Sequence, residues 1–288
     1  MRRPNLFIVG APRCGTTSMW SYLGSHPEIF MSKQKEPHFF CLDLKFADSP
    51  EPPLEEYLRH FAPASGQKKV GEASPDYLLS AVAPRAIKEF SPAAQIIIML
   101  RNPLDVMHSL HSETFNTGEP IADFEAALEA DTRRTGRQLI GYRQFTDYPE
   151  QVQRYLDTFG RDNVHIVIFD DLKENSARVY RAVLGFLGVD PTFIGKFTIR
   201  SASERVRSKR LMQLFLNPPR GVRLMGRALI PARSRAGVRR VLVNSNRTAM
   251  TRPPMDPVLR RRLQAEFAPK IEHLSTLLNR DLSGWCKV

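Results

Sequence analysis

Cysteine is scarce in this chain of 288 residues, which has only three: Cys14, Cys41 and Cys286. Because their number is odd and their spacing wide, they form neither a disulfide framework nor a metal-binding pattern. We therefore expect the chain to work in a reducing, cytoplasmic setting. Cys14 follows Arg13 at the predicted start of a helix, where the pKa of a thiol can be lowered, but a small side chain that the turn tolerates is the simpler interpretation.

Long hydrophobic runs are missing as well. The apolar run in the strongest strand candidate, Ile96–Leu100, is far shorter than the ~20 residues that a membrane-spanning helix needs. The apolar stretch after Met1 is broken at Gly10 and Pro12, so the sequence predicts no signal peptide. The hydrophobic fraction of 42% is ordinary for a soluble globular protein.

Acidic residues are nearly absent from residues 196–262, which hold 18 lysines and arginines against Glu204 and Asp256, a net charge of +16. The whole chain carries +12, so the remainder carries −4. A surface of one sign attracts anions, although arginine-rich faces are often only solvated. The basic, amphipathic stretch 221–243 could contact a membrane surface peripherally. Nucleic-acid binding is not favoured, because no recognised motif accompanies the charge.

Strand-like and helix-like segments alternate along the chain, which is the pattern of a parallel sheet covered by helices. The predicted strands are Leu6–Val9, Lys69–Glu72, Gln95–Arg101 and Val164–Phe169. The predicted helices are Thr16–Ser25, Val82–Phe90, Pro103–Phe115, Ile121–Asp131, Tyr148–Phe159 and Ala177–Leu187. The sequence predicts a single α/β domain over residues 1–288, with a core at 5–190 and a basic, mostly helical C-terminal region at 191–288.

A glycine-containing turn follows the first predicted strand, where the chain reads Gly10-Ala11-Pro12-Arg13-Cys14-Gly15-Thr16-Thr17. Two glycines five apart between strand and helix have the spacing of a nucleotide P-loop, but the lysine position holds Thr16. The missing lysine argues against a nucleoside triphosphate, whose β- and γ-phosphates it contacts. The loop amides and the helix dipole can still bind an anion, and Arg13 can supply positive charge.

A second segment ends a predicted strand with an arginine. The apolar run from Gln95 is capped by Arg101, and Asn102-Pro103 then starts a helix with Asn102 as its N-cap. Ser109, eight residues after Arg101, falls in the second turn of this helix. The two side chains can converge on one phosphate at the carboxyl edge of the sheet.

A third segment, Lys33-Gln34-Lys35-Glu36-Pro37-His38-Phe39-Phe40, sets a carboxylate and an imidazole among lysines. Together the three segments resemble the sulfotransferases that use 3′-phosphoadenosine-5′-phosphosulfate (PAPS), most clearly the bacterial members and the related carbohydrate sulfotransferases. The resemblance covers about residues 5–190, and the joint occurrence of the motifs is more specific than any one of them. It implies a P-loop-type sheet and a basic C-terminal region that covers the donor site.

The resemblance also implies a role for each segment. In the family, the loop P-[KR]-x-G-T-[TS] binds the 5′-phosphosulfate of PAPS. The resemblance therefore implies contacts with PAPS from Arg13, Cys14, Gly15, Thr16, Thr17 and Ser18. The strand-end arginine and the serine eight residues later bind the 3′-phosphate, which implies Arg101 and Ser109. A basic loop similar to 205–210 meets the same end of PAPS in many sulfotransferases, which implies Arg207. The glutamate of the K-E-P-H-F-F segment is the family's catalytic base, which implies Glu36.

Sulfuryl transfer moves a neutral SO₃ unit between two oxygens, so the acceptor must lose a proton while charge builds on the leaving phosphate. Glu36 is the predicted general base and His38 its rival, because imidazole titrates near neutrality. A surface salt bridge of Glu36 with Lys33 or Lys35 is the structural alternative. Arg13 and the loop amides are expected to stabilise the leaving phosphate.

The expected donor is PAPS and the expected product adenosine 3′,5′-bisphosphate. No metal is expected, because this donor lacks the β,γ-phosphate pair that Mg²⁺ bridges. Asp170 and Asp171, the carboxylates after the fourth predicted strand, are expected to cap the following helix.

One departure from the family pattern leaves a question open. Carbohydrate sulfotransferases carry a second lysine in a G-E-K-S-P segment, and this chain has Ala73 at that position. Lys33, Lys35 or the basic C-terminal region replaces the charge, or Arg13 suffices. The acceptor, a hydroxylated glycan, lipid or small metabolite or an amine, does not follow from the fold. Two other functions remain open: a P-loop kinase with an atypical loop, and a non-enzymatic basic nucleic-acid or anion-binding protein.

Overall fold

The computed structural model describes residues 2–44, 52–117, 121–131, 141–195, 197, 204–206, 245, 247–249 and 253–287, with only the backbone of 115–117, 204–206 and 247–249. The strands are β1 (Leu6–Gly10), β2 (Ile29–Met31), β3 (Lys69–Ala73), β4 (Gln95–Leu100), β5 (Val164–Ile168), β6 (Glu204–Val206) and β7 (Arg247–Ala249). The main helices are α1 (Thr16–Leu23), α2 (Leu54–Arg59), α3 (Ala83–Phe90), α4 (Pro103–Thr117), α5 (Phe124–Ala130), α6 (Tyr148–Phe159), α7 (Phe169–Glu174), α8 (Ser176–Leu187) and α12 (Pro257–Leu278).

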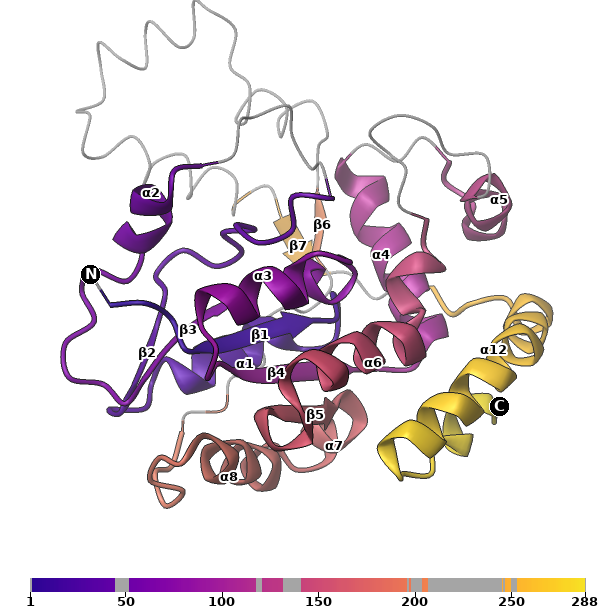
Figure 1. Cartoon of the computed structure of the whole chain (residues 1–288). Helices are drawn as coiled ribbons and strands as arrows, with labels where there is room; N and C mark the ends of the chain where they lie inside the picture. The colour runs from indigo at the N-terminus through magenta and orange to yellow at the C-terminus, as the bar shows by residue number, and fades with distance from the viewer. Residues whose placement is uncertain are drawn as a thin grey trace, which may run out of the picture. The chain divides into compact units, whose positions relative to one another are not determined.

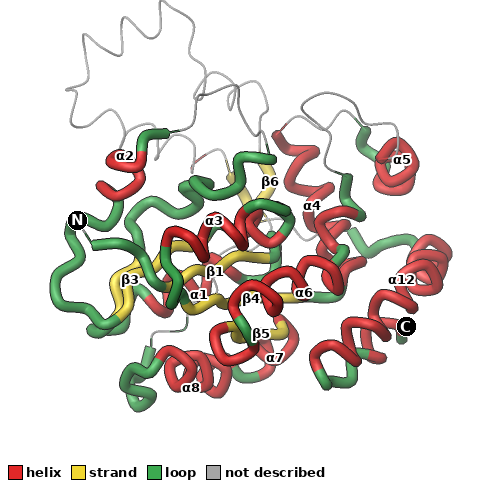
Figure 2. The backbone as a smooth tube through the Cα atoms, in the orientation of Figure 1, coloured by secondary structure: helices red, strands yellow, loops and turns green. Residues whose placement is uncertain are grey.

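Five parallel strands form the central sheet, in the order β2-β3-β1-β4-β5. Every residue of β1 is buried, as is all of β4 except its first residue, because helices cover both faces of the sheet. Figure 1 shows α3 and α6 in front of the sheet and α1 behind it, and Figure 2 shows the strands enclosed by helices. The predicted fold class, a P-loop-type parallel sheet flanked by helices, is confirmed.

The predicted elements agree with the observed ones to within a few residues. The four predicted strands are present, and α6 has the predicted bounds. Neither β2 nor the six-residue helices α2 and α7 were predicted, because elements this short show no clear period in the sequence. No helix in the part of the chain that the structure describes is long and apolar enough to cross a membrane.

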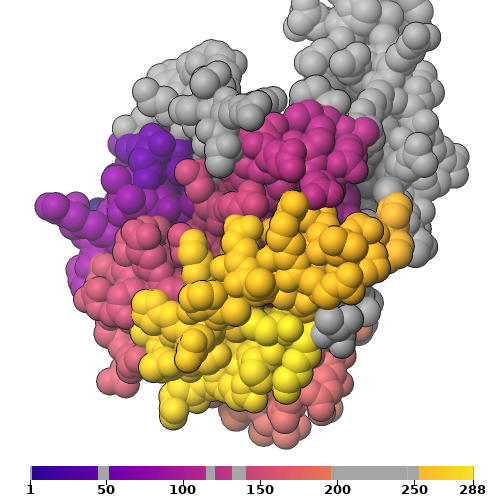
Figure 3. Space-filling view, turned by 90° about the vertical axis from the view of Figure 1, so that its right-hand side faces the viewer, coloured from indigo at the N-terminus to yellow at the C-terminus, as the bar shows by residue number. Residues whose placement is uncertain are grey.

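The C-terminal helix α12 packs beside α6, and Figure 3 shows the C-terminal segment spread over that face of the molecule. Two hydrogen bonds tie the end of the chain to the sheet. The Asn102 side-chain amide donates to the Trp285 carbonyl at 3.1 Å, and the Trp285 indole N–H donates to Asp170 at 3.0 Å. The last residues therefore lie against the carboxyl ends of β4 and β5.

The chain divides into two compact units. One comprises Met1–His111, Asp123–Arg200 and Met255–Val288, and the other Ser112–Ala122 and Ser201–Pro254. Within the second unit β6 and β7 pair antiparallel, which the prediction of a mostly helical C-terminal region did not include. Arg207 and the amphipathic stretch 221–243 lie outside the described residues, so the expected cover over the donor site stays a prediction.

Candidate functional site

The loop after β1 has the backbone that the two glycines predict. Gly15 has φ 87°, a left-handed conformation that favours glycine, and it is the N-cap of α1. At Gly10 an added Cβ would lie 2.3 Å from the Leu78 Cβ, so the packing leaves no room for another residue. The turn therefore needs both glycines.

The N-terminus of α1 is suited to an anion. The first amides of a helix carry its positive partial charge and can donate to a ligand, and in α1 the Ser18 amide also donates to the Gly15 carbonyl at 3.0 Å. The first turn of α1 contains no acidic side chain. Thr16 and Ser18 are buried and Thr17 is partly exposed, so hydroxyl groups lie around these amides. The arrangement is that of a phosphate-binding helix terminus.

Arg13 joins this loop to α4. Its Nε donates a hydrogen bond of 2.8 Å to Ser109 Oγ, across 96 positions in sequence. Ser109 is buried in α4, with a relative exposure of 1%. Two of the predicted segments, the loop and the Arg101–Ser109 pair, thus meet through a direct contact.

Arg101 follows the end of β4, as predicted. Its guanidinium lies 4.9 Å from the centroid of the Phe169 ring, and its Nη2 lies 3.5 Å from Asp105. Asp105 also accepts a hydrogen bond of 2.8 Å from Arg260 on α12. Asn102 caps α4 through its side-chain oxygen, which accepts from the Leu104 amide at 3.0 Å, so that part of the prediction is confirmed.

Cys14 contradicts the idea of an activated thiol. Its side chain is fully buried. Its Sγ lies 3.4 Å from the Pro12 carbonyl oxygen and 3.9 Å from the Tyr148 hydroxyl. Burial raises the pKa of the thiol to about 12 and outweighs the opposing effects of the hydrogen bond to Tyr148 and the nearby arginines. The side chain fills the interior, so any contact of Cys14 with a donor must come from its backbone.

Glu36 and His38 form an ion-paired chain. Glu36 contacts the Lys35 ammonium group, and its second oxygen lies 3.8 Å from His38 Nε2. His38 Nδ1 in turn lies 3.6 Å from Asp76. The pairing of Glu36 with Lys35, the structural alternative from the sequence, is therefore present beside its contact with His38.

These contacts shift both pKa values. Burial raises the pKa of Glu36, but the interactions with His38 and Lys35 prevail and lower it to about 2. Burial lowers the pKa of His38, but the contact with Glu36 and the charges of Asp76 and Glu72 prevail and raise it. Glu36 is thus ionised at neutral pH, and His38 is more readily protonated than a free histidine.

Three of the predicted site residues have a strained backbone. Arg13, Glu36 and His38 have φ values of 63°, 62° and 53°, in the left-handed region that costs a non-glycine residue roughly 1–2 kcal/mol. Among the described residues the other non-glycine with positive φ is Asn279, which ends α12. Strain of this kind concentrates at functional sites, where the surrounding contacts maintain it.

The segment 33–40, which contains Glu36 and His38 and is called the base segment from here on, lies beside the loop because it continues from β2 along β3. The Ser32 amide donates to the Gly71 carbonyl at 2.8 Å, and the Glu36 amide donates to the Ala73 carbonyl at 3.0 Å. The strands β3, β1 and β4 are neighbours in the sheet. Consequently the base segment, the loop and Arg101 all lie at one carboxyl edge, which is where open parallel sheets bind ligands.

Asp170 and Asp171 do not cap the next helix, which corrects that prediction. They lie in the first turn of α7, where Asp170 accepts from Trp285 and Asp171 pairs with Arg280 at 2.6 and 2.7 Å. The cap of α8 is Asn175, whose side chain accepts from the Arg178 amide at 2.9 Å. Both aspartates therefore hold the C-terminal segment. Among the described residues no group of three or more potential metal ligands occurs.

What replaces the second lysine, or whether Arg13 suffices, stays a prediction. Ala73 is fully buried, Lys33 is exposed, and Lys35 pairs with Glu36. The choice among these residues and the basic C-terminal region stays a prediction.

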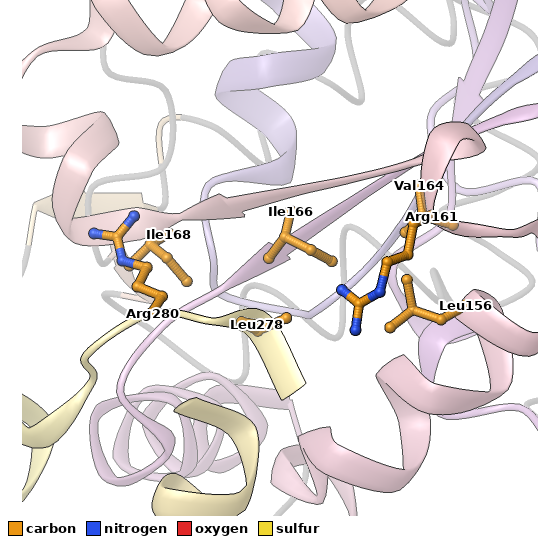
Figure 4. Close-up of a pocket in the computed structure, with 7 residues that line it drawn as sticks. All are labelled: Leu156, Arg161, Val164, Ile166, Ile168, Leu278 and Arg280. Carbon is orange, nitrogen blue, oxygen red and sulfur yellow. The ribbon is translucent and has the colours of Figure 1, made fainter. Parts of the chain in front are cut away.

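A cavity of about 170 Å³ lies along β5, away from the predicted site. Figure 4 shows Arg161 and Arg280 at its two ends. Its remaining lining residues are Leu156, Val164, Ile166, Ile168 and Leu278. None of the predicted site residues that the structure describes borders it.

Several side chains that support the site were not predicted from the sequence. The Tyr148 hydroxyl lies against Cys14, and Glu72 lies beneath the base segment with Ser74 and Tyr77. A carboxylate between the apolar residues of a short strand was the available signal for Glu72. Tyr148 gave none, because its contact spans 134 positions.

Comparisons with known proteins agree with this arrangement. The family described as Sulfotransferase domain matches residues 3–274. The fold is similar to the crystal structure of a sulfotransferase from Alicyclobacillus acidocaldarius, with a TM-score of 0.74, 29% identity and coverage of 99% of both chains.

Two curated mouse proteins are also similar. The chain is 25% identical over 199 residues to the bifunctional heparan sulfate N-deacetylase/N-sulfotransferase 1 of Mus musculus, covering 66% of this chain and 23% of that protein. It is 29% identical over 128 residues to the heparan sulfate glucosamine 3-O-sulfotransferase 6 of Mus musculus, covering 43% of this chain and 34% of that protein. The match thus spans less than a quarter of the first relative and about a third of the second. Because the family match covers nearly all of its length, the chain belongs to the sulfotransferase domain family.

Proposed function

We propose that this protein transfers a sulfuryl group from PAPS to a hydroxyl or amine of an acceptor. The observation that carries the proposal is the contact of Arg13 with Ser109, which joins the loop to the Arg101 segment. Membership of the family and the similarity to the bacterial sulfotransferase support it.

The residues at the sheet edge suit a donor with phosphate groups at both ends. The uncapped first turn of α1, with its hydroxyls and Arg13, offers donors to the 5′-phosphosulfate. Arg101 and Ser109 offer charge-assisted and neutral hydrogen bonds to a 3′-phosphate. A guanidinium has five N–H donors, so the ion pair of Arg101 with Asp105 leaves others for a ligand.

When bound, the donor supplies an activated sulfuryl group. We infer that Glu36 accepts the proton of the acceptor as the new sulfur–oxygen or sulfur–nitrogen bond forms and the bond from sulfur to the phosphate oxygen breaks. Arg13 and the loop amides would stabilise the electron pair left on that oxygen. The ion pair with His38 keeps Glu36 ionised in the free protein and orients it.

The relatives suggest the class of acceptor. One is named for N-sulfotransfer on heparan sulfate and the other for 3-O-sulfotransfer on its glucosamine. We therefore propose a carbohydrate hydroxyl or amine as the first acceptor class to test, ahead of lipids and small metabolites.

The test is transfer from radiolabelled PAPS to panels of glycans, lipids and small hydroxylated molecules, with Glu36→Gln as the matched control. We expect label in one class with the parent protein and at least ~10²-fold less with the variant. Transfer from ATP with Mg²⁺ in place of PAPS would contradict the proposal and favour a kinase. Thermal-shift binding of a duplex oligonucleotide, without binding of adenosine 3′,5′-bisphosphate, would favour the non-enzymatic alternative.

A further inference from the structure

Glu72 is a carboxylate in the interior of the protein. It lies in β3 with a relative exposure of 0%, between the apolar strands β1 and β2. A buried carboxylate is costly unless its oxygens receive hydrogen bonds. The function proposed above assigns it no part, so its presence in the strand needs another explanation.

Three hydroxyl groups satisfy this carboxylate. Tyr57 and Tyr77 donate to Oε1 at 2.6 and 3.1 Å, and Ser74 donates to Oε2 at 2.7 Å. Burial raises the pKa of Glu72 to about 7, against the opposing effect of these hydrogen bonds. Burial and the charge of Glu72 raise the pKa values of both tyrosines well above their usual range, so the phenols keep their protons and act as donors.

Two of the three hydroxyls also accept from the backbone of the base segment. Ser74 Oγ accepts from the His38 amide at 3.3 Å. The Tyr77 hydroxyl accepts from the amides of Phe39 and Phe40 at 2.9 and 3.3 Å. Because an amide can only donate, Ser74 and Tyr77 must direct their single proton toward Glu72.

The network therefore has one direction, from the amides of 38–40 through two hydroxyls to one carboxylate. Hydrogen bonds aligned in this way strengthen one another. Tyr57 is different, because its hydroxyl bonds to Glu72 without contacting a base-segment amide in the described structure, while its ring stacks on Phe39 at 4.3 Å.

We propose that Glu72 is a positioning residue that fixes the backbone after Glu36 through Ser74 and Tyr77. It thereby orients the Glu36 and His38 side chains toward the acceptor. This role rests on the proposed function, because the orientation of Glu36 and His38 matters for catalysis only if these residues act on an acceptor. The left-handed backbone at Glu36 and His38 agrees with it, since such conformations persist only where neighbouring contacts determine them.

A purely structural role for Glu72 makes a different prediction. If the network only satisfied a buried charge, the loss of either tyrosine hydroxyl would reduce stability without a specific effect on the base segment. The two tyrosines provide a matched pair, because Tyr57→Phe and Tyr77→Phe each delete one hydroxyl bonded to the same oxygen and keep the ring.

The first measurement is amide hydrogen exchange of residues 36–41 in the full-length protein. Tyr77→Phe is expected to speed exchange of the Phe39 and Phe40 amides by about 5- to 10-fold, the loss of one ordinary hydrogen bond. Tyr57→Phe is expected to leave these amides protected. Equal rates in the two variants would overturn the proposal.

The second measurement is turnover against donor KM. We expect Tyr77→Phe to lower kcat by at least ~10-fold with the PAPS KM changed by less than about threefold, since the donor contacts lie on other segments. We expect Tyr57→Phe to retain kcat within about threefold. Unchanged kcat in Tyr77→Phe, or an equal loss in both variants, would overturn the proposal.

Two controls keep the outcomes distinct. If Tyr77→Phe does not fold, Ser74→Ala tests the other branch of the network, with faster exchange of the His38 amide as the expected result. If the parent protein binds no adenosine 3′,5′-bisphosphate and transfers no sulfuryl group, the proposed function fails, and with it the aiming of a base. The exchange rates then still decide whether Glu72 fixes the segment.

Discussion

Arg13 Nε donates to Ser109 Oγ at 2.8 Å and thereby connects the turn after β1 with the second turn of α4. The two residues come from separate motifs, each of which implies contact with a different end of PAPS. If the protein binds PAPS as proposed, their contact would make the two phosphate subsites neighbours. A change in Arg13 is therefore expected to act on Ser109 as well as on the 5′ subsite.

The first prediction concerns the general base. Replacing Glu36 by Gln keeps the shape and removes the proton acceptor, so turnover should fall at least ~10²-fold, the low end for positioned proton transfer. Affinity for adenosine 3′,5′-bisphosphate, measured by calorimetry, should change no more than a few-fold, because Glu36 contacts Lys35 and His38 and lies outside the loop. Near-normal turnover in this variant would move the role to His38 or to water.

The second prediction concerns metals. Thr16 replaces the lysine of a triphosphate site, and Asp170 and Asp171 are engaged by Trp285 and Arg280. Sulfuryl transfer should therefore persist in excess EDTA at an unchanged rate. A strict requirement for Mg²⁺ would contradict the account and direct attention to the two aspartates.

The third prediction concerns pH and stability. Burial raises the pKa of Glu72 from 4.5 to about 7, although its hydroxyl partners and His38 act in the opposite direction. Between pH 4.5 and about 7 the folded protein holds a proton on Glu72 that the unfolded chain releases. The stabilising contribution of this proton to the free energy of unfolding is therefore complete below pH 4.5 and is lost as pH rises through 7. Glu72→Gln lacks this dependence.

Urea unfolding of the parent protein and of Glu72→Gln at pH 5 and pH 7 measures this pH dependence of stability. The free energy of unfolding of the parent protein, relative to Glu72→Gln, should fall by about 2 kcal/mol over this interval. A difference that does not change with pH would show that Glu72 titrates in its usual range.

The fourth prediction concerns the thiols. Cys14 is fully buried with a pKa raised to about 12, whereas Cys286 is partly exposed. Because the thiolate is the reactive form, iodoacetamide should modify Cys286 at least ~10-fold faster than Cys14 in the native protein, as followed by peptide mass spectrometry. Rapid modification of Cys14 would mean that the loop opens in solution.

The sequence predicted the fold well, because its signals were local. The apolar run before Arg101 predicted a buried strand, which is β4. The two glycines of the first turn are required by one left-handed conformation and one close contact. The meeting of the three motifs at one sheet edge also followed, because parallel strands bring their carboxyl ends together.

The supporting contacts could not be predicted in the same way. The pairing of Asp170 with Trp285 spans 115 positions, and nothing near either residue specifies the other. The raised pKa of Cys14 could not be predicted either, since its charged neighbour Arg13 is visible in the sequence whereas its burial against Tyr148 is not. Both the pairing of Asp170 and the pKa of Cys14 depend on contacts between residues that are far apart in the sequence.

The most direct test of the account is calorimetry of adenosine 3′,5′-bisphosphate and AMP with the parent protein and with Arg101→Ala. A charge-assisted hydrogen bond contributes ~1.5–3 kcal/mol, so the parent protein should prefer the bisphosphate by about ten- to a hundredfold. Arg101→Ala should erase most of that preference and bind AMP as before. If the parent protein binds both nucleotides equally, or if Arg101→Ala keeps the preference, the assignment of the 3′-phosphate to Arg101 and Ser109 is wrong.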